Sequence, residues 1–211
     1  MAAAQATKRS TAAEPRSHAA RREEAERAML RAAVMLIAEK GIAGLTLNDV
    51  GEAAGYSRGL PAHYFGTRDQ LVGAVARHMT QEFARGLGRE AIAPGLAGTL
   101  RACDAYLRTA ARDPTAVRAL MIVFAEATAQ PGLFPDVIDV TRGGIAGFHA
   151  SLKAGQAQGE IRRDIDPRAQ AALILGQLRG VVAEWLMDPK LFSLDRARSQ
   201  MLANLRRSLM P

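Results

Sequence analysis

Apolar residues recur at intervals of three and four positions along most of the chain, the spacing of amphipathic helices rather than of strands. The first stripe predicts a helix over residues 21–39, ended by Gly41, and consists of Ala25, Met29, Ala33, Leu36 and Ile37. From residue 94 onward, proline and glycine divide the pattern into further helices, expected over residues 96–112, 115–128, 136–158, 167–187 and 194–209. We therefore expect an all-α protein.

Helix-start signals follow one another closely between residues 46 and 71. Thr46 precedes Asp49 by three positions and Thr67 precedes Gln70 by three, as in a capping box. Between them, Gly55 allows a turn with positive φ at little steric cost. These signals predict helices over residues 47–54, 58–65 and 68–83. Two short helices joined by a tight turn form a helix-turn-helix, whose second helix enters the DNA major groove.

The run GYSRGLPAHYFGTRD, residues 55–69, resembles the DNA-binding signature of TetR-family transcriptional regulators. The preceding segments AEKG at 38–41 and LTLNDV at 45–50 resemble that family too, so the motif covers about residues 25–79. The rest of the chain is similar only in its length and helical pattern. Pro61 departs from expectation by lying inside the second helix of the motif. We expect it to be tolerated, because so early in a short helix it removes only one hydrogen bond.

The resemblance implies a DNA-contacting surface made of Thr46, Ser57, Arg58, Gly59, Leu60, His63, Tyr64, Thr67 and Arg68. Residues 57–60 would form the first turn of the recognition helix. Arg58 would bind either a guanine edge or a phosphate, and a solvated surface arginine is a third possibility. The family often has the order Tyr-His-Phe where this chain has His63-Tyr64-Phe65, which leaves open whether His63 or Tyr64 contacts DNA.

Composition limits the partners and the cellular compartment that we expect for this protein. The 211 residues carry a net charge of +7, spread over both halves, so charge suits a polyanionic partner without locating a DNA site. The single Cys103 excludes an intrachain disulfide and fits a reducing compartment. The chain lacks an apolar run of roughly 18 residues and a signal-peptide core, so we expect a cytoplasmic protein. No pattern indicates a cofactor, and the four histidines lack metal-ligand spacing.

Three segments are expected. Residues 1–20, rich in Ala, Ser, Thr and Arg, would form a flexible N-terminal arm that either reaches DNA or is simply solvated. Residues 21–68 would form the helix-turn-helix domain, and residues 69–211 a helical ligand-binding and dimerisation domain. In the helix expected over 167–187 apolar residues occur on nearly every side, so more than one face must be covered. We expect the last two helices to form a homodimer, the alternative being a core helix with a terminal cover.

The resemblance also implies a small-molecule effector bound inside the helical body. Candidate lining residues are Phe83, Cys103, Tyr106, Leu107, Met121, Phe124, His149 and Trp185, with Glu126 and Gln177 as polar anchors. Their mainly apolar character favours an uncharged or amphipathic ligand.

The predicted function is a dimeric, ligand-responsive repressor that binds a palindromic DNA operator. One alternative is an architectural DNA-binding protein without an effector, which would bind with weak sequence preference and strong salt dependence. Another is an all-helical enzyme, but the sequence carries none of the common nucleophile, phosphate-loop or zinc-protease motifs. We therefore expect no catalytic activity.

Overall fold

The computed structural model describes residues 17–87, 94–130 and 132–211, apart from the side chains of residues 83, 84, 86 and 87. Within this part of the chain every regular element is a helix, which confirms the expected all-α class. The helices are α1 (His18–Lys40), α2 (Leu47–Ala53), α3 (Leu60–Phe65), α4 (Arg68–Leu87), α5 (Leu96–Arg112), α6 (Pro114–Ala129), α7 (Pro135–Ala157), α8 (Pro167–Met187) and α9 (Leu194–Leu209).

Side-chain caps mark the starts of α1, α2, α6, α8 and α9. α5, α8 and α9 have the predicted bounds, and α9 starts where the Ser193 hydroxyl accepts a hydrogen bond from the Arg196 N–H at 3.3 Å. α1 begins earlier than predicted, at His18, because the Ser17 hydroxyl accepts from the Ala20 N–H at 3.2 Å. The helix therefore starts inside the segment expected to be an arm, and residues 1–16 of that segment lie outside the described part of the chain.

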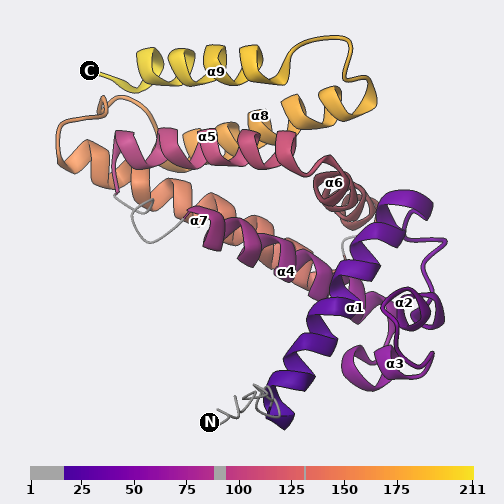
Figure 1. Ribbon diagram of the computed structural model, residues 1–211. Coiled ribbons are helices and arrows are strands. Elements are labelled where there is room, and N and C mark those ends of the chain that lie inside the picture. Colours follow the sequence, from indigo (N-terminus) through magenta and orange to yellow (C-terminus); the bar gives the residue numbers. More distant parts are fainter. Residues whose placement is uncertain (1–16, 88–93, 131) are drawn as a thin grey trace, which may run out of the picture.

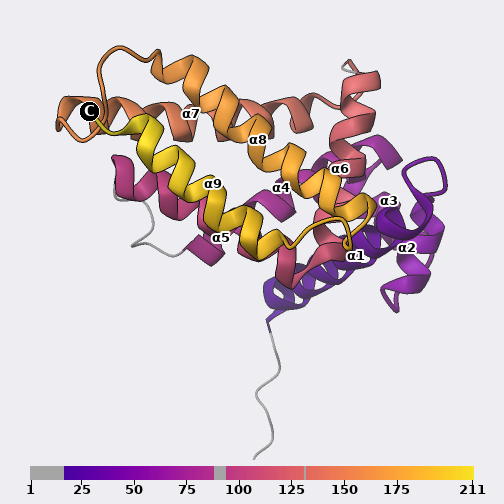
Figure 2. The ribbon, with the colours of Figure 1, turned by 90° about the horizontal axis from the view of Figure 1, so that it is seen from above.

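The helices form a small head and a larger body (Figure 1). The head, defined here as α1 to α3 with the first turns of α4, lies at the opposite end of the molecule from α9. α4 runs from the head into the body, where it packs beside α7. Seen from above, α8 and α9 lie next to each other across the near face of the body, between α7 and α5 in the view (Figure 2).

Two clusters of buried apolar side chains hold these parts together. The first joins α1, α2 and α4 of the head to α6 and α7, with Ile37, Val50 and Leu71 packed in the same cluster as Val123 and Phe134. The second fills the space among α5 to α9. The core of the head therefore continues into the body instead of closing on itself.

α8 is only partly covered by its own chain. Ile174, Leu178 and Val182 are buried, whereas Leu173 is 58% exposed and Met187 is 71% exposed. None of the described helices combines the length and the apolar character that crossing a membrane would require.

Candidate nucleic-acid interface and ligand cavity

α2 and α3 are joined by the tight turn that the sequence predicts. The Thr46 hydroxyl accepts from the Asp49 N–H at 3.1 Å and so caps α2. After α2, Gly55 has a φ of 77°, which only glycine adopts without strain, and the Tyr56 N–H donates to the Gly51 carbonyl at 2.8 Å. These contacts fix the direction in which the chain enters α3.

Gly51, which is not among the predicted site residues, sets the distance between α2 and the turn. A Cβ atom at this position would lie 2.6 Å from the Ser57 carbonyl oxygen and 3.2 Å from Pro61 Cδ. The absence of a side chain therefore lets α2 approach the start of α3. In the sequence, the only indication of this role was the presence of a glycine inside a short predicted helix.

The recognition helix begins later than predicted. α3 starts at Leu60, with Gly59 at its N-cap, so the prediction that Ser57 and Arg58 are in its first turn is wrong. The cause is Pro61, which occupies the first turn, where its missing N–H would have had no acceptor within the helix. Ser57 instead closes the preceding turn, its carbonyl accepting from the Leu60 N–H at 3.0 Å.

The residues predicted to contact DNA lie in α3, in the turns that flank it and at the first turns of α2 and α4. Leu60 and Tyr64 are partly buried, and the other seven, Thr46, Ser57, Arg58, Gly59, His63, Thr67 and Arg68, are exposed. Arg58 already has a partner, since its Nη2 atom lies 2.9 Å from Glu52 Oε2 of α2. Both side chains of this pair are mostly exposed, so the pair stays open to exchange with an anion.

The start of α4 is a reciprocal capping box, as predicted. The Thr67 N–H donates to Gln70 Oε1 at 2.8 Å, and the Gln70 N–H donates to the Thr67 hydroxyl at 3.2 Å. Arg68 follows, and its Nε atom donates to Asp69 Oδ1 at 3.3 Å. The first turn of α4 is thus fixed at the surface beside α3.

His63 and Tyr64 differ in their surroundings. The His63 ring is exposed, whereas Tyr64 packs partly against the head core. Arg22 of α1 lies over the Tyr64 ring, with Cζ 5.6 Å from the ring centroid, a contact that the sequence did not reveal. Tyr64 therefore links α3 to α1, and His63 is the ring that faces solvent.

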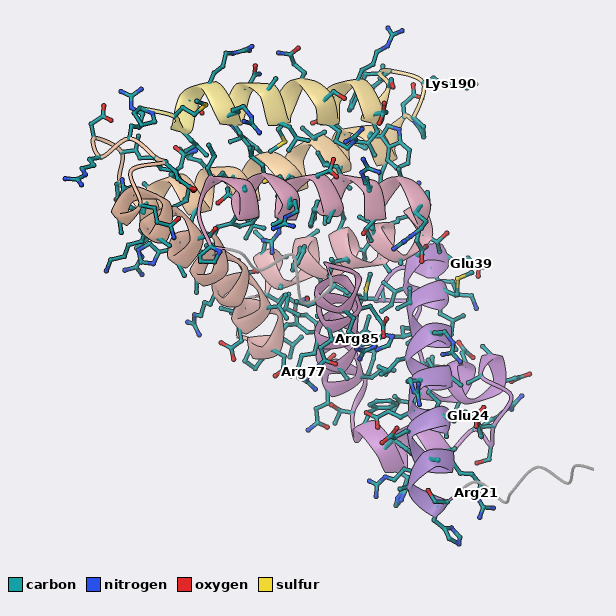
Figure 3. All side chains as sticks on the ribbon, turned by 60° about the vertical axis from the view of Figure 1, so that its left-hand side comes forward. Arg21, Glu24, Glu39, Arg77, Arg85 and Lys190 are labelled. Atoms are coloured by element: carbon teal, nitrogen blue, oxygen red, sulfur yellow. The ribbon has the colours of Figure 1, made fainter. Side chains whose placement is uncertain are left out.

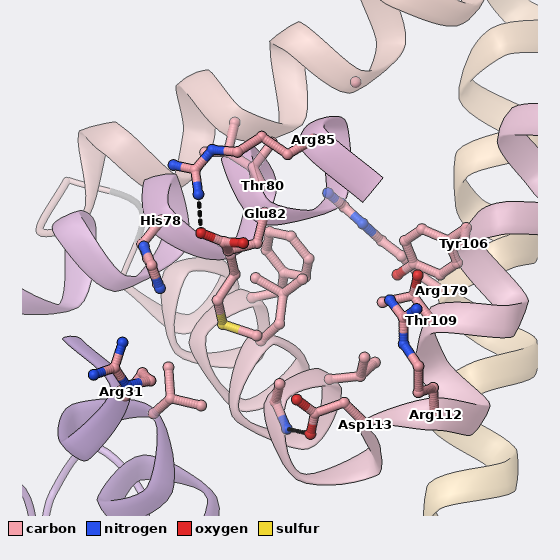
Figure 4. A pocket seen from close by; sticks show the side chains of 18 of the residues that line it. Arg31, His78, Thr80, Glu82, Arg85, Tyr106, Thr109, Arg112, Asp113 and Arg179 are labelled. Carbon is pink, nitrogen blue, oxygen red and sulfur yellow. Dashed lines mark hydrogen bonds and ion pairs between the residues drawn. The ribbon is translucent and has the colours of Figure 1, made fainter. Parts of the chain in front are cut away.

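Behind the head lies a cavity of about 770 Å³, within the roughly 300–1,000 Å³ usual for ligand pockets. α1, α4, α5, α6, α7 and α8 all contribute to its wall. Figure 4 shows Arg31 and His78 toward one side of the view and Tyr106, Thr109, Arg112 and Arg179 toward the other. The cavity thus extends from the head helices α1 and α4 to α8.

The predicted ligand residues divide into three groups. Tyr106 and Phe124 line the cavity. Cys103 and Leu107 are fully buried in the second core cluster, where burial raises the pKa of the Cys103 thiol to about 12. The remaining described candidates, Met121, His149, Trp185, Glu126 and Gln177, lie outside the lining, and the Phe83 side chain lies outside the described part of the structure.

The cavity wall is more cationic than the predicted residues implied. It includes five arginines, Arg27, Arg31, Arg85, Arg112 and Arg179, against the two carboxylates Glu82 and Asp113. Arg27 and Arg31 were missed because α1 was assigned to the DNA-binding domain alone. They are four residues apart and precede Val34 and Met35, so the polar and apolar parts of one α1 face both line the cavity.

Burial lowers the pKa of two titratable groups in the cavity wall. It lowers the pKa of His78; the Glu82 carboxylate opposes this shift, and Arg85 and Arg31 add to it. Burial also lowers the pKa of Arg179, again because the charged form loses its hydration. The charged form of each of these side chains is therefore less stable in the cavity wall than in water.

An ion pair joins α4 to the start of α7 in the body. Arg77 Nη1 lies 2.5 Å from Asp136 Oδ2 at the start of α7, and Figure 3 shows Arg77 and Arg85 projecting from α4. α4 begins in the head and lines the cavity farther along its length, so a movement of α4 would change both the head and the cavity.

Two family models together account for most of the chain. The model described as bacterial regulatory proteins, tetR family, matches residues 29–75. The model of the C-terminal domain of BetI-type transcriptional repressors matches residues 96–209, which is more than half of the chain. The chain belongs to the TetR family. The resemblance carried by residues 55–69 is thereby confirmed, and in this TetR-family chain the described helix-turn-helix lies within the first matched region.

A transcriptional repressor of Mycobacterium tuberculosis is 41% identical over 91 residues, which are 43% of this chain and 47% of the relative. The TetR-family chain thus spans about half the length of the curated relatives it matches. A TetR-family regulator from a Rhodococcus species has a TM-score of 0.79 at 26% identity, covering 89% of this chain and 99% of its own. FadR of Bacillus subtilis, solved with stearoyl-CoA, has a TM-score of 0.73 at 22% identity, covering 86% and 98%, and shows similarity of fold.

Proposed function

We propose that this chain is a cytoplasmic, ligand-responsive transcriptional repressor that binds a palindromic DNA operator as a homodimer and has no catalytic activity. The observation that carries the proposal is the exposed helix-turn-helix surface between two fixed capping residues, Thr46 and Thr67. Such a surface presents N–H groups and hydroxyls to phosphates on either side of the recognition helix.

In this proposal α3 enters the major groove, and Arg58 and His63 face the DNA from its two ends. Tyr64 supports α3 from below through its contact with Arg22, which favours His63 as the aromatic residue that touches the backbone. Arg58 exchanges Glu52 for a base edge or a phosphate.

Dimerisation through α8 and α9 is supported by the uncovered face of α8. Leu173, Met187 and the following Leu191 are 58%, 71% and 67% exposed. A Cβ atom added to Gly176 or Gly180 would meet no atom within 4 Å, so a partner helix can approach closely there. Two helices of one protomer and two of its partner would form a four-helix bundle. The two recognition helices would then lie about 34–36 Å apart, one turn of DNA.

The cavity supports the ligand-responsive part of the proposal. It has walls on α1 and α4 as well as on the body, so a bound effector would alter the position of the head relative to the dimer interface. FadR of Bacillus subtilis, which is similar in fold, was solved with stearoyl-CoA, which supports ligand binding by a protein of this fold.

The proposal is tested by selecting bound sequences from a random duplex library with the full chain at physiological salt. We expect an enriched palindrome. Binding without enrichment that disappears as the salt concentration rises would instead identify an architectural DNA-binding protein.

On the selected operator, Arg58→Ala should weaken specific binding by about 1–3 kcal/mol if Arg58 binds a base. Glu52→Gln is the matched variant, since it frees Arg58 and removes a nearby negative charge; it should bind the operator at least as tightly as the wild type. The measurement is the Kd on operator and on random DNA. An equal loss on both would assign Arg58 to a phosphate, and no loss on either would remove it from the interface.

A further inference from the structure

Arg179 is the most buried of the arginines and carboxylates that line the cavity. It projects from α8, and its Nε atom is buried with no hydrogen-bond partner among the described residues. Its Nη2 atom donates to the Thr141 hydroxyl at 3.1 Å. A guanidinium has five N–H donors, so several remain available at its edge.

The Arg179 guanidinium is held in place by an aromatic ring. Its Cζ atom lies 3.7 Å from the centroid of the Phe124 ring. Stacking of this kind occupies the face of the guanidinium and leaves the donors in its plane free to bind a carboxylate. The side chain is therefore ordered before any ligand arrives, which lowers the entropy cost of binding.

The charge around Arg179 is not balanced by the protein. Glu82 is already paired with Arg85, and the Asp113 carboxylate caps α6 by accepting from the Ala116 N–H at 3.0 Å. No described carboxylate forms an ion pair with Arg31, Arg112 or Arg179. A partly buried cation without a counter-ion is unfavourable, and a bound anion would relieve that cost.

The rest of the wall is suited to an apolar body. Side chains from five helices supply it: Val34 of α1, Met79 of α4, Leu120 and Phe124 of α6, and Phe148 of α7 with Leu175 of α8. Methionine adapts readily to a flexible chain, and the phenylalanine rings supply a large apolar contact surface. An apolar surface that leads away from a stacked guanidinium matches a molecule with one anionic end.

We propose that the cavity binds an amphipathic carboxylate, with its carboxylate on the edge of Arg179 and its apolar body against α1, α4 and α6. This inference rests on the proposed function insofar as the carboxylate is the effector. The apolar body contacts Val34 and Met79, so an effector bound in this way touches both helices that connect the head to the body.

The test is calorimetric titration of the full chain without DNA, using decanoate, 1-decanol and decanoyl-CoA as probes. We expect decanoate to bind about ten- to a hundredfold more tightly than decanol, the usual effect of a hydrogen-bonded charge. Arg179→Met should weaken decanoate binding by a similar factor and leave decanol binding unchanged. Arg108→Met on α5 is the matched control, because Arg108 is exposed and outside the cavity wall, and it should change neither affinity.

Equal affinities for decanoate and decanol in the wild type, or decanoate binding that survives in Arg179→Met, would overturn the proposal. Binding of decanoyl-CoA alone would also overturn it, because the recognised anion would then be a phosphate. Arg179→Lys keeps the charge but loses the planar stack, and should show an intermediate loss even if Arg179→Met fails to fold. Since no DNA is present, these results are independent of operator binding, whose failure would contradict only the repressor.

Discussion

At the scale of single residues, two glycines of the helix-turn-helix differ in their backbone conformation. Gly55 has a φ of 77°, whereas Gly59 has a φ of −81°, and neither has an atom within 4 Å of a Cβ position. Neither site is therefore crowded, and any difference between alanine substitutions must come from the backbone.

Gly55→Ala should reduce the free energy of unfolding by about 1–2 kcal/mol, the cost of a left-handed L-residue. Gly59→Ala should leave it unchanged or raise it by about 0.4–1 kcal/mol, because alanine restricts the unfolded chain. Chemical denaturation of both variants measures the difference. Similar stabilities for the two would mean that the turn can change its conformation at little cost.

The role of a residue could be predicted from the sequence when it depends only on contacts within that residue's own helix. The caps Thr46, Thr67 and Ser193 were predictable, because a hydroxyl oxygen and the N–H three residues later are fixed by the helix itself. Gly51 and Arg22 were not, because their roles depend on a different helix: Gly51 faces the turn before α3, and Arg22 faces the Tyr64 ring.

At the scale of elements, α7 contains glycines with opposite roles. A Cβ atom on Gly155 would lie 2.8 Å from Ile161 Cγ1 and 3.3 Å from Gly95 Cα, so α7 packs directly on the residue before α5. A Cβ atom on Gly147 of the same helix would meet nothing within 4 Å.

Gly155→Ala should therefore destabilise the protein by about 1–3 kcal/mol through overpacking. Gly147→Ala should stabilise it by up to about 1 kcal/mol, since alanine favours the helix. Thermal unfolding of the two variants compares them under identical conditions. A stable Gly155→Ala would show that Ile161 can move aside at no cost.

Helix positions were largely predictable because proline, glycine and capping residues mark their ends. The start of α3 was the main exception. There the motif suggested residues 58–65, but Pro61 set the first turn two residues later. How the helices pair was beyond reach of the pattern, since an apolar stripe shows that a face is buried without naming its partner. For this reason Cys103 and Leu107 were expected in the cavity wall and are instead core residues.

At the scale of the whole molecule, the exposed face of α8 predicts the oligomeric state. Leu173→Glu places a charge in the proposed interface, where burial of an unpaired carboxylate is costly. We expect the mass in solution to fall to that of one chain and operator affinity to fall with it. Leu133→Glu is the control, because Leu133 is also exposed, at 40%, but lies outside α8 and α9.

Light scattering after size-exclusion chromatography distinguishes these outcomes. A Leu173→Glu protein that keeps the mass of two chains would place the dimer interface elsewhere on the molecule. A wild-type protein with the mass of one chain would contradict the dimer altogether.

A cavity in the helical body was expected, and Tyr106 and Phe124 line it as predicted, but its cationic wall was not foreseen, because the cavity lies where head and body meet. Its cationic residues come from α1, α4, α5 and α8, helices that are distant along the chain. Only the folded arrangement brings Arg31 and Arg179 to the same space, and no local pattern in either helix marks it.

The contribution of α1 to the cavity bears on how such proteins can be recombined. Exchange of the N-terminal segment between related chains would transfer Arg27, Arg31, Val34 and Met35 together with the helix-turn-helix. Under the proposed function, such a hybrid would take its operator preference from one parent and its ligand specificity from both. Under the same proposal, altering α3 alone would change the operator and leave the cavity wall intact, because no residue of α3 lines the cavity.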